Sequence, residues 1–175
     1  MSPRRQRIVT IVLMGVAGAG KSTVMASLVE LLGWPWLEGD ALHPPANVEK
    51  MAAGMPLSDA DRMPWLDAVA GWIGERERER SSCVVTCSTL RRDYRDRLRR
   101  GHPSIWFVHL QAPVEVLEGR IEQRLGHFMP ASMLASQLDA LEPLQSDEPG
   151  WAVDALGEPA AIARRIVRAL RLDPD

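Results

Sequence analysis

Lysine and net charge are both scarce in this chain. Of its 21 basic side chains only two are lysines, Lys21 and Lys50, so each of them calls for an explanation. The formal net charge of −2 over 175 residues excludes a general electrostatic attraction to nucleic acid or to an anionic membrane. We therefore expect small molecules as partners, and neither nucleic acid nor a membrane.

Cysteine is equally rare. Cys83 and Cys87 lie four residues apart in a run that is typical of a β-strand, where the rise per residue separates them by roughly 13 Å. That separation excludes a disulfide between the two. Two thiols without a His/Cys cluster of metal-ligand spacing favour a reducing compartment, and we expect the protein in the cytoplasm.

The remaining composition is that of a globular protein. Apolar residues make up 46% and charged residues 25% of a chain that is long enough for one hydrophobic core and short for two. No internal repeat, low-complexity segment or long linker divides it. We predict a single domain over residues 1–175.

Strand-like and helical patterns alternate along the chain. The strand-like runs are short and mostly rich in β-branched or aromatic residues, and they cover residues 8–14, 36–39, 83–88, 105–110 and 151–155. Helical spacing covers residues 22–32, 47–53, 62–80, 91–100, 114–125, 131–141 and 159–172. The alternation predicts a three-layer α/β fold in which a five-stranded parallel sheet is flanked by helices. Ligands of such a fold bind at the carboxyl ends of the strands.

The first predicted strand leads into a phosphate-binding loop (P-loop). The run from Gly15 to Ser22, GVAGAGKS, matches G-x-x-x-x-G-K-[ST] at every fixed position and lies between a strand and a helix, so the fold is of the P-loop NTPase type. Glycines let successive N–H groups approach phosphate oxygens, and the start of the helix adds its positive dipole end. The residues expected to bind the phosphates of ATP are Gly15, Ala17, Gly18, Ala19, Gly20, Lys21, Ser22 and Thr23. Lys21 reaches the β- and γ-phosphates, and the Ser22 hydroxyl is placed to bind Mg²⁺.

Asp40 follows the second predicted strand, at the edge that faces the P-loop in a fold of this kind. Two functional roles fit this carboxylate: it accepts the proton of an acceptor hydroxyl, or it positions a magnesium-bound water. A turn-capping aspartate is the structural alternative. The sequence leaves these readings open.

Longer strings beyond the P-loop resemble the gluconokinase family almost position for position. They include Gly39-Asp40-x-Leu42-His43-Pro44, Asn47-x-x-Lys50-Met51, Asp59-x-Asp61-Arg62-x-Pro64-Trp65-Leu66, Cys87-Ser88-x-Leu90, Tyr94-Arg95-Asp96 and Gly126-His127-Phe128-Met129-Pro130. The resemblance covers about residues 8–143. It implies an adenylate-kinase-like fold and ATP-dependent phosphorylation of gluconate at its terminal hydroxyl, with Mg²⁺, and it suggests a homodimer.

The acceptor site needs a cation for the carboxylate of gluconate, and donors and acceptors for its hydroxyls. The resemblance and the side-chain types together nominate Asp40, His43, Lys50, Arg62, Ser88, Arg91, Arg95 and His127. Arg95 is preferred among the six arginines of residues 91–100 because it lies in a matched string. Arg91 departs from the family pattern, which usually has lysine there, and a guanidinium differs from an ammonium in geometry. For His43 a structural role is an equal alternative.

Arg120 and Arg124 lie four residues apart and so share one helix face, ahead of a segment that contains Gly126 and Pro130. The pattern predicts a small helical lid over about residues 124–141. In kinases of this architecture, lid arginines close over the nucleotide and exclude water. We expect Arg124 to contact the transferring phosphoryl group, as a catalytic residue with Lys21 and Asp40, and Arg120 to contact the nucleotide; the reverse assignment of the two arginines is the alternative. An exposed amphipathic helix is the alternative.

Two rival functions remain. The same fold phosphorylates other acceptors, such as shikimate, a nucleoside monophosphate or another polyol acid. A nucleotide-binding regulatory module without an acceptor site is the second rival. The polar strings after the second and third predicted strands weigh against it.

Overall fold

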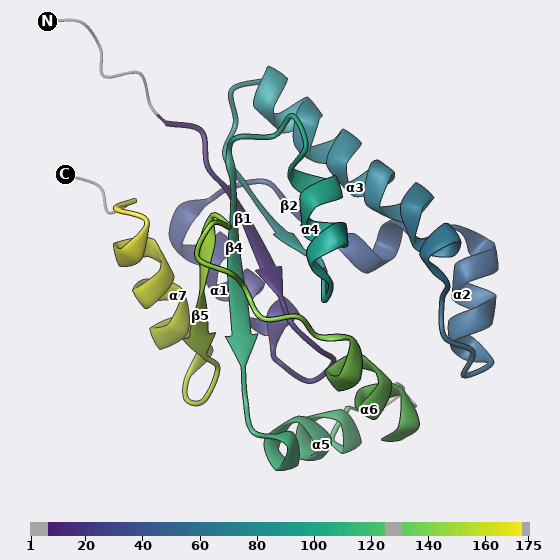
Figure 1. The fold of residues 1–175 in the computed structure, drawn as a ribbon. Helices are drawn as coiled ribbons and strands as arrows, with labels where there is room; N and C mark the ends of the chain where they lie inside the picture. The colour runs from purple at the N-terminus through teal and green to yellow at the C-terminus, as the bar shows by residue number, and fades with distance from the viewer. Residues whose placement is uncertain (1–6, 125–130, 173–175) are drawn as a thin grey trace, which may run out of the picture.

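The protein is built around a parallel sheet, as the sequence predicts. The computed structural model describes residues 7–124 and 131–172. Its five strands pair in the order β2-β3-β1-β4-β5, all parallel (Figure 1). They are β1 (Thr10–Met14), β2 (Trp36–Glu38), β3 (Cys83–Thr86), β4 (Ile105–Gln111) and β5 (Gly150–Asp154). The predicted α/β fold with a five-stranded parallel sheet is confirmed.

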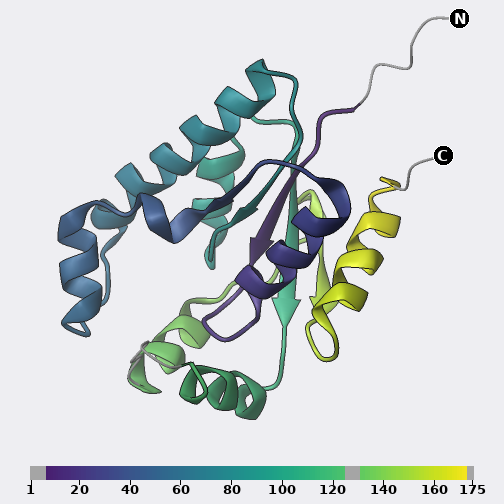
Figure 2. The same cartoon turned by 180° about the vertical axis from the view of Figure 1, so that it is seen from behind.

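Helices cover both faces of the sheet (Figures 1 and 2). Ile11 and Leu13 of β1 pack into one apolar cluster with α1 (Lys21–Leu32) and α7 (Pro159–Ala169). The intervening Val12 and Met14 pack into the other cluster with α3 (Asp59–Arg78) and α4 (Arg92–Arg99). Successive side chains of a strand point to opposite faces, so a central strand buried on both sides must be apolar throughout, as β1 is.

The remaining elements lie beyond the carboxyl ends of the strands. They are the 3₁₀ helix η1 (Gly39–Leu42), α2 (Pro45–Ala52), α5 (Val114–Glu122) and α6 (Ala131–Ala140). The sequence patterns did not reveal η1. The predicted lid over residues 124–141 includes α6, but its residues 125–130 lie outside the described part of the chain.

The start of α3 lies earlier than the sequence analysis placed it. Ser58 and Asp61 form a capping box, in which the Asp61 amide donates to Ser58 Oγ at 3.2 Å and the Ser58 amide donates to Asp61 Oδ2 at 2.9 Å. Such reciprocal bonds satisfy two otherwise unpaired N–H groups at a helix start. The helix then runs through Pro64.

The sheet register brings the chain segments after the strands to one edge. Leu13 pairs with Thr86, Met14 with His109 and Glu38 with Thr86, so the segments that follow β1, β2, β3 and β4 emerge side by side. The P-loop follows β1 and η1 follows β2 at this edge. No helix in the described ranges is long and apolar enough to cross a membrane.

Candidate active site

The P-loop between β1 and α1 depends on glycine for its shape. Gly15, Gly18 and Gly20 have φ values of +139°, +79° and +92°, which side-chain-bearing residues rarely adopt. A Cβ on Gly15 would lie 2.8 Å from the Leu110 carbonyl oxygen, and one on Gly18 would lie 2.7 Å from that of Leu117. The three glycines therefore let the loop lie directly against its neighbours while it turns into α1.

Lys21 bends back over the P-loop. Its Nζ donates to the carbonyl oxygens of Gly15 at 2.9 Å and Val16 at 3.0 Å. Burial lowers the pKa of Lys21 from its usual value, and the nearby negative charge of Asp40 opposes that shift. The positive charge of Arg124 acts on Lys21 as well and lowers its pKa. The structure thus places the other two expected catalytic groups, Asp40 and Arg124, within electrostatic reach of Lys21.

Arg120 braces the P-loop from α5. Its Nη1 donates to the carbonyl oxygens of Gly18 and Ala19, both at 3.3 Å, and its Nη2 donates to Ala155 O at 2.7 Å, after β5. These bonds tie the loop to the segment that joins β5 to α7. Arg124, which follows α5, is exposed.

Asp40 lies on η1 with its side chain 79% exposed. The indole Nε1 of Trp65, from α3, donates at 2.8 Å to the carbonyl oxygen of the preceding residue, Gly39. A Cβ on Gly39 would lie 2.2 Å from Thr86 O, so only glycine lets β2 and β3 run this close at their ends. The carboxylate is exposed, but the backbone that carries it is fixed.

Two arginines flank the ring of Tyr94 on the acceptor side. The guanidinium carbons of Arg62 and Arg91 each lie 5.5 Å from the ring centroid. The hydroxyl of Tyr94 donates to Asp59 Oδ1 at 2.5 Å, and Arg91 Nη1 lies 3.5 Å from Asp59 Oδ2. Half-exposed arginines held near an aromatic ring are suited to bind a carboxylate.

Ser88 and Lys50 have different surroundings. Ser88 is half-buried, and its carbonyl oxygen accepts the Gly15 amide at 3.3 Å, so the turn after β3 contacts the start of the P-loop. Lys50 Nζ donates to both carboxylate oxygens of Asp61 at 2.8 Å. The hydrogen bond from Lys50 and those from Ser58 lower the pKa of Asp61 to about 2. In this structure Lys50 therefore joins α2 to the start of α3.

Arg95 is the clearest correction to the sequence analysis. The favoured acceptor ligand has a fully buried side chain. It donates from Nε to Glu148 Oε1 at 2.6 Å and from Nη2 to Oε2 at 3.0 Å. Its Nη1 donates to the carbonyl oxygens of Thr89, Leu90 and Glu142, each at 3.1 Å. Because its donors bind these protein groups, Arg95 has a structural role and does not face an open site.

The pair formed by Arg95 and Glu148 supports a strained residue. Thr89 is buried and has φ of +35°, in the left-handed region that β-branched residues avoid. It lies between Ser88 and Leu90, and Arg95 binds its carbonyl oxygen. Backbone in such a conformation persists only where the surroundings over-determine it. Arg95 therefore shapes the turn that carries Ser88.

The structure also brings in residues that the sequence analysis did not assign. Gln137 of α6 accepts the Ala17 amide through Oε1 at 2.7 Å, which joins the predicted lid to the P-loop. Asn47 of α2 is 3% exposed and bonds to His43. Asn47 and Trp65 lie in strings that carry the family resemblance, and that was the only signal for them. His127 lies outside the described residues.

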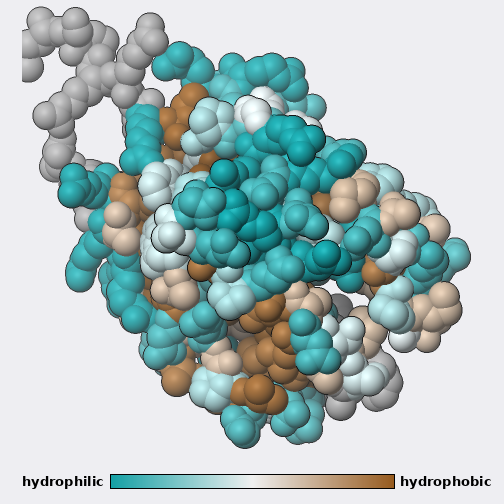
Figure 3. Space-filling view, viewed as in Figure 1, coloured by the Kyte–Doolittle hydropathy of each residue, from teal (hydrophilic) through white to brown (hydrophobic). Residues whose placement is uncertain are grey.

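Surface hollows lie on two sides of the sheet. One cavity of about 550 Å³ borders the P-loop between the end of β4, α5 and α6, and it is lined mostly by apolar residues such as Leu110 and Leu138. Figure 3 shows apolar side chains gathered on this part of the surface, and a hollow between the α2–α3 side and the α6 side. Another cavity, of about 570 Å³, lies at the opposite edge, where Ile105 begins β4 and Gly150 begins β5.

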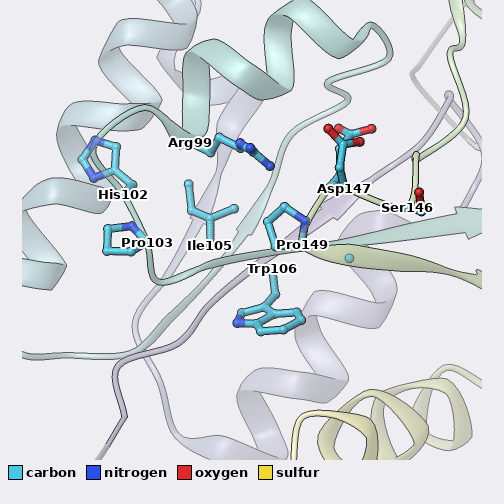
Figure 4. A pocket seen from close by; sticks show the side chains of 10 residues that line it. Arg99, His102, Pro103, Ile105, Trp106, Ser146, Asp147 and Pro149 are labelled. Carbon is cyan, nitrogen blue, oxygen red and sulfur yellow. The ribbon is translucent and has the colours of Figure 1, made fainter.

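The charged side chains that line the cavity at the opposite edge mostly bind one another or other residues of the protein. Arg99 points toward Asp147 across it (Figure 4). Asp147 already accepts two hydrogen bonds from Arg92, both at 2.7 Å, and His102 Nδ1 lies 2.7 Å from Glu77 Oε2. Its charged lining groups are thus mostly paired within the protein.

Known proteins place the chain in a family. A family model described as an AAA domain matches residues 10–144. A gluconokinase of Gluconobacter oxydans (strain 621H) is 48% identical over 158 residues, which is 90% of this chain and 89% of that protein. The chain belongs to the gluconokinase family.

Solved structures agree with membership of the gluconokinase family. A gluconokinase from Sinorhizobium meliloti 1021 is 43% identical, with a TM-score of 0.80 and coverage of 95% of this chain and 97% of that one. An unliganded sugar kinase from Janibacter sp. HTCC2649 is 44% identical, with a TM-score of 0.89 and coverage of 95% and 96%. The family resemblance stated from the sequence is confirmed, and with it the P-loop kinase fold.

Proposed function

We propose that this chain transfers the terminal phosphoryl group of ATP to the terminal hydroxyl of gluconate, giving 6-phosphogluconate and ADP. Membership of the gluconokinase family supports the reaction and the acceptor. The observation that carries the proposal is the position of Lys21 and Asp40 after parallel strands at one edge of the sheet, near enough that the charge of Asp40 opposes the lowering of the Lys21 pKa. A phosphate donor on the P-loop is then flanked by a carboxylate that can accept a proton.

The donor side rests on the P-loop. Backbone amides from Gly15 to Thr23 bind the phosphates, and Lys21 exchanges its two loop carbonyls for the β- and γ-phosphate oxygens. Arg124, exposed and close to Lys21, neutralises charge on the transferring group. Arg120 contacts the nucleotide from α5. Closure of the lid over residues 124–141 excludes water.

The acceptor side lies between η1, α3 and the turn before α4. Arg62 and Arg91 bind the carboxylate of gluconate, since both are cations beside Tyr94. Ser88, Lys50 and, from outside the described residues, His127 bind hydroxyls, and His43 lies beside Asp40 in the same site.

The chemistry is a displacement with the two oxygens in line. The terminal oxygen of gluconate forms a bond to the γ-phosphorus while the bond to the β–γ bridging oxygen breaks, and ADP leaves. Asp40 accepts the proton that the hydroxyl loses.

The half-buried hydroxyl of Ser22, in the first turn of α1, fits Mg²⁺. Mg²⁺ prefers oxygen ligands and is usually held by one or two protein groups together with substrate phosphates. The described residues contain no cluster of three or more His, Cys, Asp or Glu that could hold a metal, so Ser22 is the protein group we assign to it. When bound, Mg²⁺ neutralises charge on the β- and γ-phosphates.

We assign the reaction to the cytoplasm. Cys83 and Cys87 are both free thiols and buried. Reducing compartments keep thiols in this state.

The test is release of ADP by the purified protein with a panel of acceptors: gluconate, shikimate, a nucleoside monophosphate and other polyol acids. Gluconate gives the highest kcat/KM. Asp40→Asn lowers kcat by roughly 10²–10⁴-fold, the usual contribution of a general base, with little change in nucleotide affinity. Lys21→Ala lowers kcat by at least about 10²-fold. Turnover of ATP that no acceptor stimulates would contradict the proposal.

A further inference from the structure

The orientation of the Asn47 side chain is fixed by its hydrogen bonds. Its Nδ2 lies 2.9 Å from the carbonyl oxygen of Asp61, a group that can only accept, so this atom is the amide nitrogen. The same nitrogen lies 3.2 Å from Nδ1 of His43. An amide nitrogen only donates, so Nδ1 of His43 accepts and carries no proton. Neutral His43 therefore holds its proton on Nε2.

The plane of the His43 ring is fixed as well. The ring stacks on the indole of Trp65, with centroids 4.2 Å apart and an angle of 16° between the planes. Trp65 is 1% exposed and donates to Gly39 O, next to Asp40 in the chain. The His43 side chain itself is only 4% exposed. One indole thus holds both the ring and the backbone that carries Asp40.

The protonated nitrogen faces Asp40. Nε2 of His43 lies 3.7 Å from Asp40 Oδ1, just beyond direct hydrogen-bond distance. Burial lowers the pKa of His43, and so does the positive charge of Arg62, whereas the charge of Asp40 opposes the shift. Because Nδ1 accepts from Asn47, the ring has a single N–H donor, Nε2, on the side of the carboxylate.

We propose that Asn47 is a positioning residue that locks His43 as the Nε2–H tautomer, so that the N–H of His43 faces Asp40 Oδ1 and leaves Oδ2 for the acceptor hydroxyl. The inference rests on the proposed function, because it gives Asp40 the role of base. It assigns Asn47 a task that neither the motif nor the charge pattern indicates. His43 acts on Asp40 and not directly on a hydroxyl of the acceptor.

The first test is independent of activity. Histidine ring ¹⁵N spectra of the wild-type protein, with the His43 signals identified by their loss in His43→Gln, report which nitrogen carries the proton. We expect an unprotonated Nδ1 and a protonated Nε2. A ring protonated at Nδ1 would overturn the inference, whatever the protein phosphorylates.

The second test compares two replacements of His43. The amide nitrogen of Gln reaches the place of Nε2, whereas that of Asn reaches the place of Nδ1. We expect His43→Asn and Asn47→Leu to lower kcat on the order of 10²-fold, the loss that a misplaced catalytic group causes, with KM for ATP unchanged. His43→Gln recovers most of that loss, and Val48→Ala, a 51% exposed neighbour, behaves as wild type.

The possible outcomes distinguish failure of the positioning role of Asn47 from failure of the proposed function. Equal kcat values for His43→Gln and His43→Asn, in a protein that phosphorylates gluconate, would overturn the positioning role alone. Failure of the wild type to phosphorylate any acceptor would overturn the proposed function, and the ring spectra would still decide the tautomer. If Asn47→Leu does not fold, the wild-type ring spectra and the comparison of His43→Gln with His43→Asn still test the inference.

Discussion

The buried ion pair between Arg95 and Glu148 makes a quantitative prediction. Both side chains have zero exposure, and Nε and Nη2 of the guanidinium bind the two carboxylate oxygens at 2.6 and 3.0 Å. Glu148→Gln keeps the shape of the side chain but removes its charge, and it leaves the guanidinium buried without a counterion. Breaking a buried pair in this way costs about 3–5 kcal/mol. For a protein of this size that lowers Tm by roughly 6–20 °C.

The measurement is denaturant and thermal unfolding of Glu148→Gln beside a matched control. Asp67→Asn breaks a pair of the same geometry on the surface: Arg97, on the same helix as Arg95, binds Asp67 of α3 at 2.8 and 2.7 Å. Exposed pairs contribute less than about 1 kcal/mol. If the two variants lose equal stability, burial does not set the strength of the Arg95 pair and the reasoning is wrong.

The same pair predicts how stability depends on pH. Burial by itself raises the pKa of Glu148, but the hydrogen bonds from Arg95 and from the Gln145 amide outweigh it and leave the pKa below its usual value. A carboxyl group of lowered pKa adds stability that is complete above its unfolded pKa, about 4.3, and is lost as pH falls through the folded value. The wild type should therefore lose stability below about pH 4 more steeply than Glu148→Gln does.

Three further predictions concern the P-loop and the thiols. Gly15→Ala should abolish ATP binding in calorimetry, because the new Cβ would meet Leu110 O at 2.8 Å at a φ of +139°; binding of normal affinity would show that the loop adapts. Arg120→Met removes three bonds to backbone carbonyls and should weaken ATP binding at least about tenfold, whereas an unchanged Kd would show that the brace is dispensable. Burial raises the pKa of Cys83 to about 11 and that of Cys87 further, so neither thiol should react with a thiol reagent at pH 8 until the protein unfolds; rapid labelling of the native protein would contradict this.

The strands and helices were predictable because their signals are local. β-branched runs such as Ile8–Leu13 and the glycine-lysine pattern after them identify a buried strand and a P-loop without any knowledge of tertiary contacts. All five strands and the seven predicted helices occur in the structure, with ends shifted by a few residues. The order of the strands could not be derived in the same way, because pairing depends on contacts between distant segments.

The role of Arg95 shows where local reasoning stops. The helix predicted over residues 91–100 has six arginines, and residue type alone does not distinguish the buried one. Its position three residues before the buried Leu98 and next to the buried Tyr94 was a usable signal for an inward-facing side. Its partner Glu148 lies 53 residues away, and no spacing rule connects the two. The tautomer of His43 likewise depends on a carbonyl group of another helix.

The place of β2 in the sheet affects how the protein can change over evolution. β2 is one of the two edge strands, has only three residues and pairs with β3 alone, whereas the P-loop follows β1 at the centre of the sheet. The strand that leads into the P-loop therefore has a neighbouring strand on each side, whereas Asp40 and α2 follow a strand at the edge of the sheet. Substitutions over residues 39–52, other than at Gly39, Asp40, His43 and Asn47, can change which sugar acid is accepted while residues 10–32 stay the same, and a search for new acceptors should begin there.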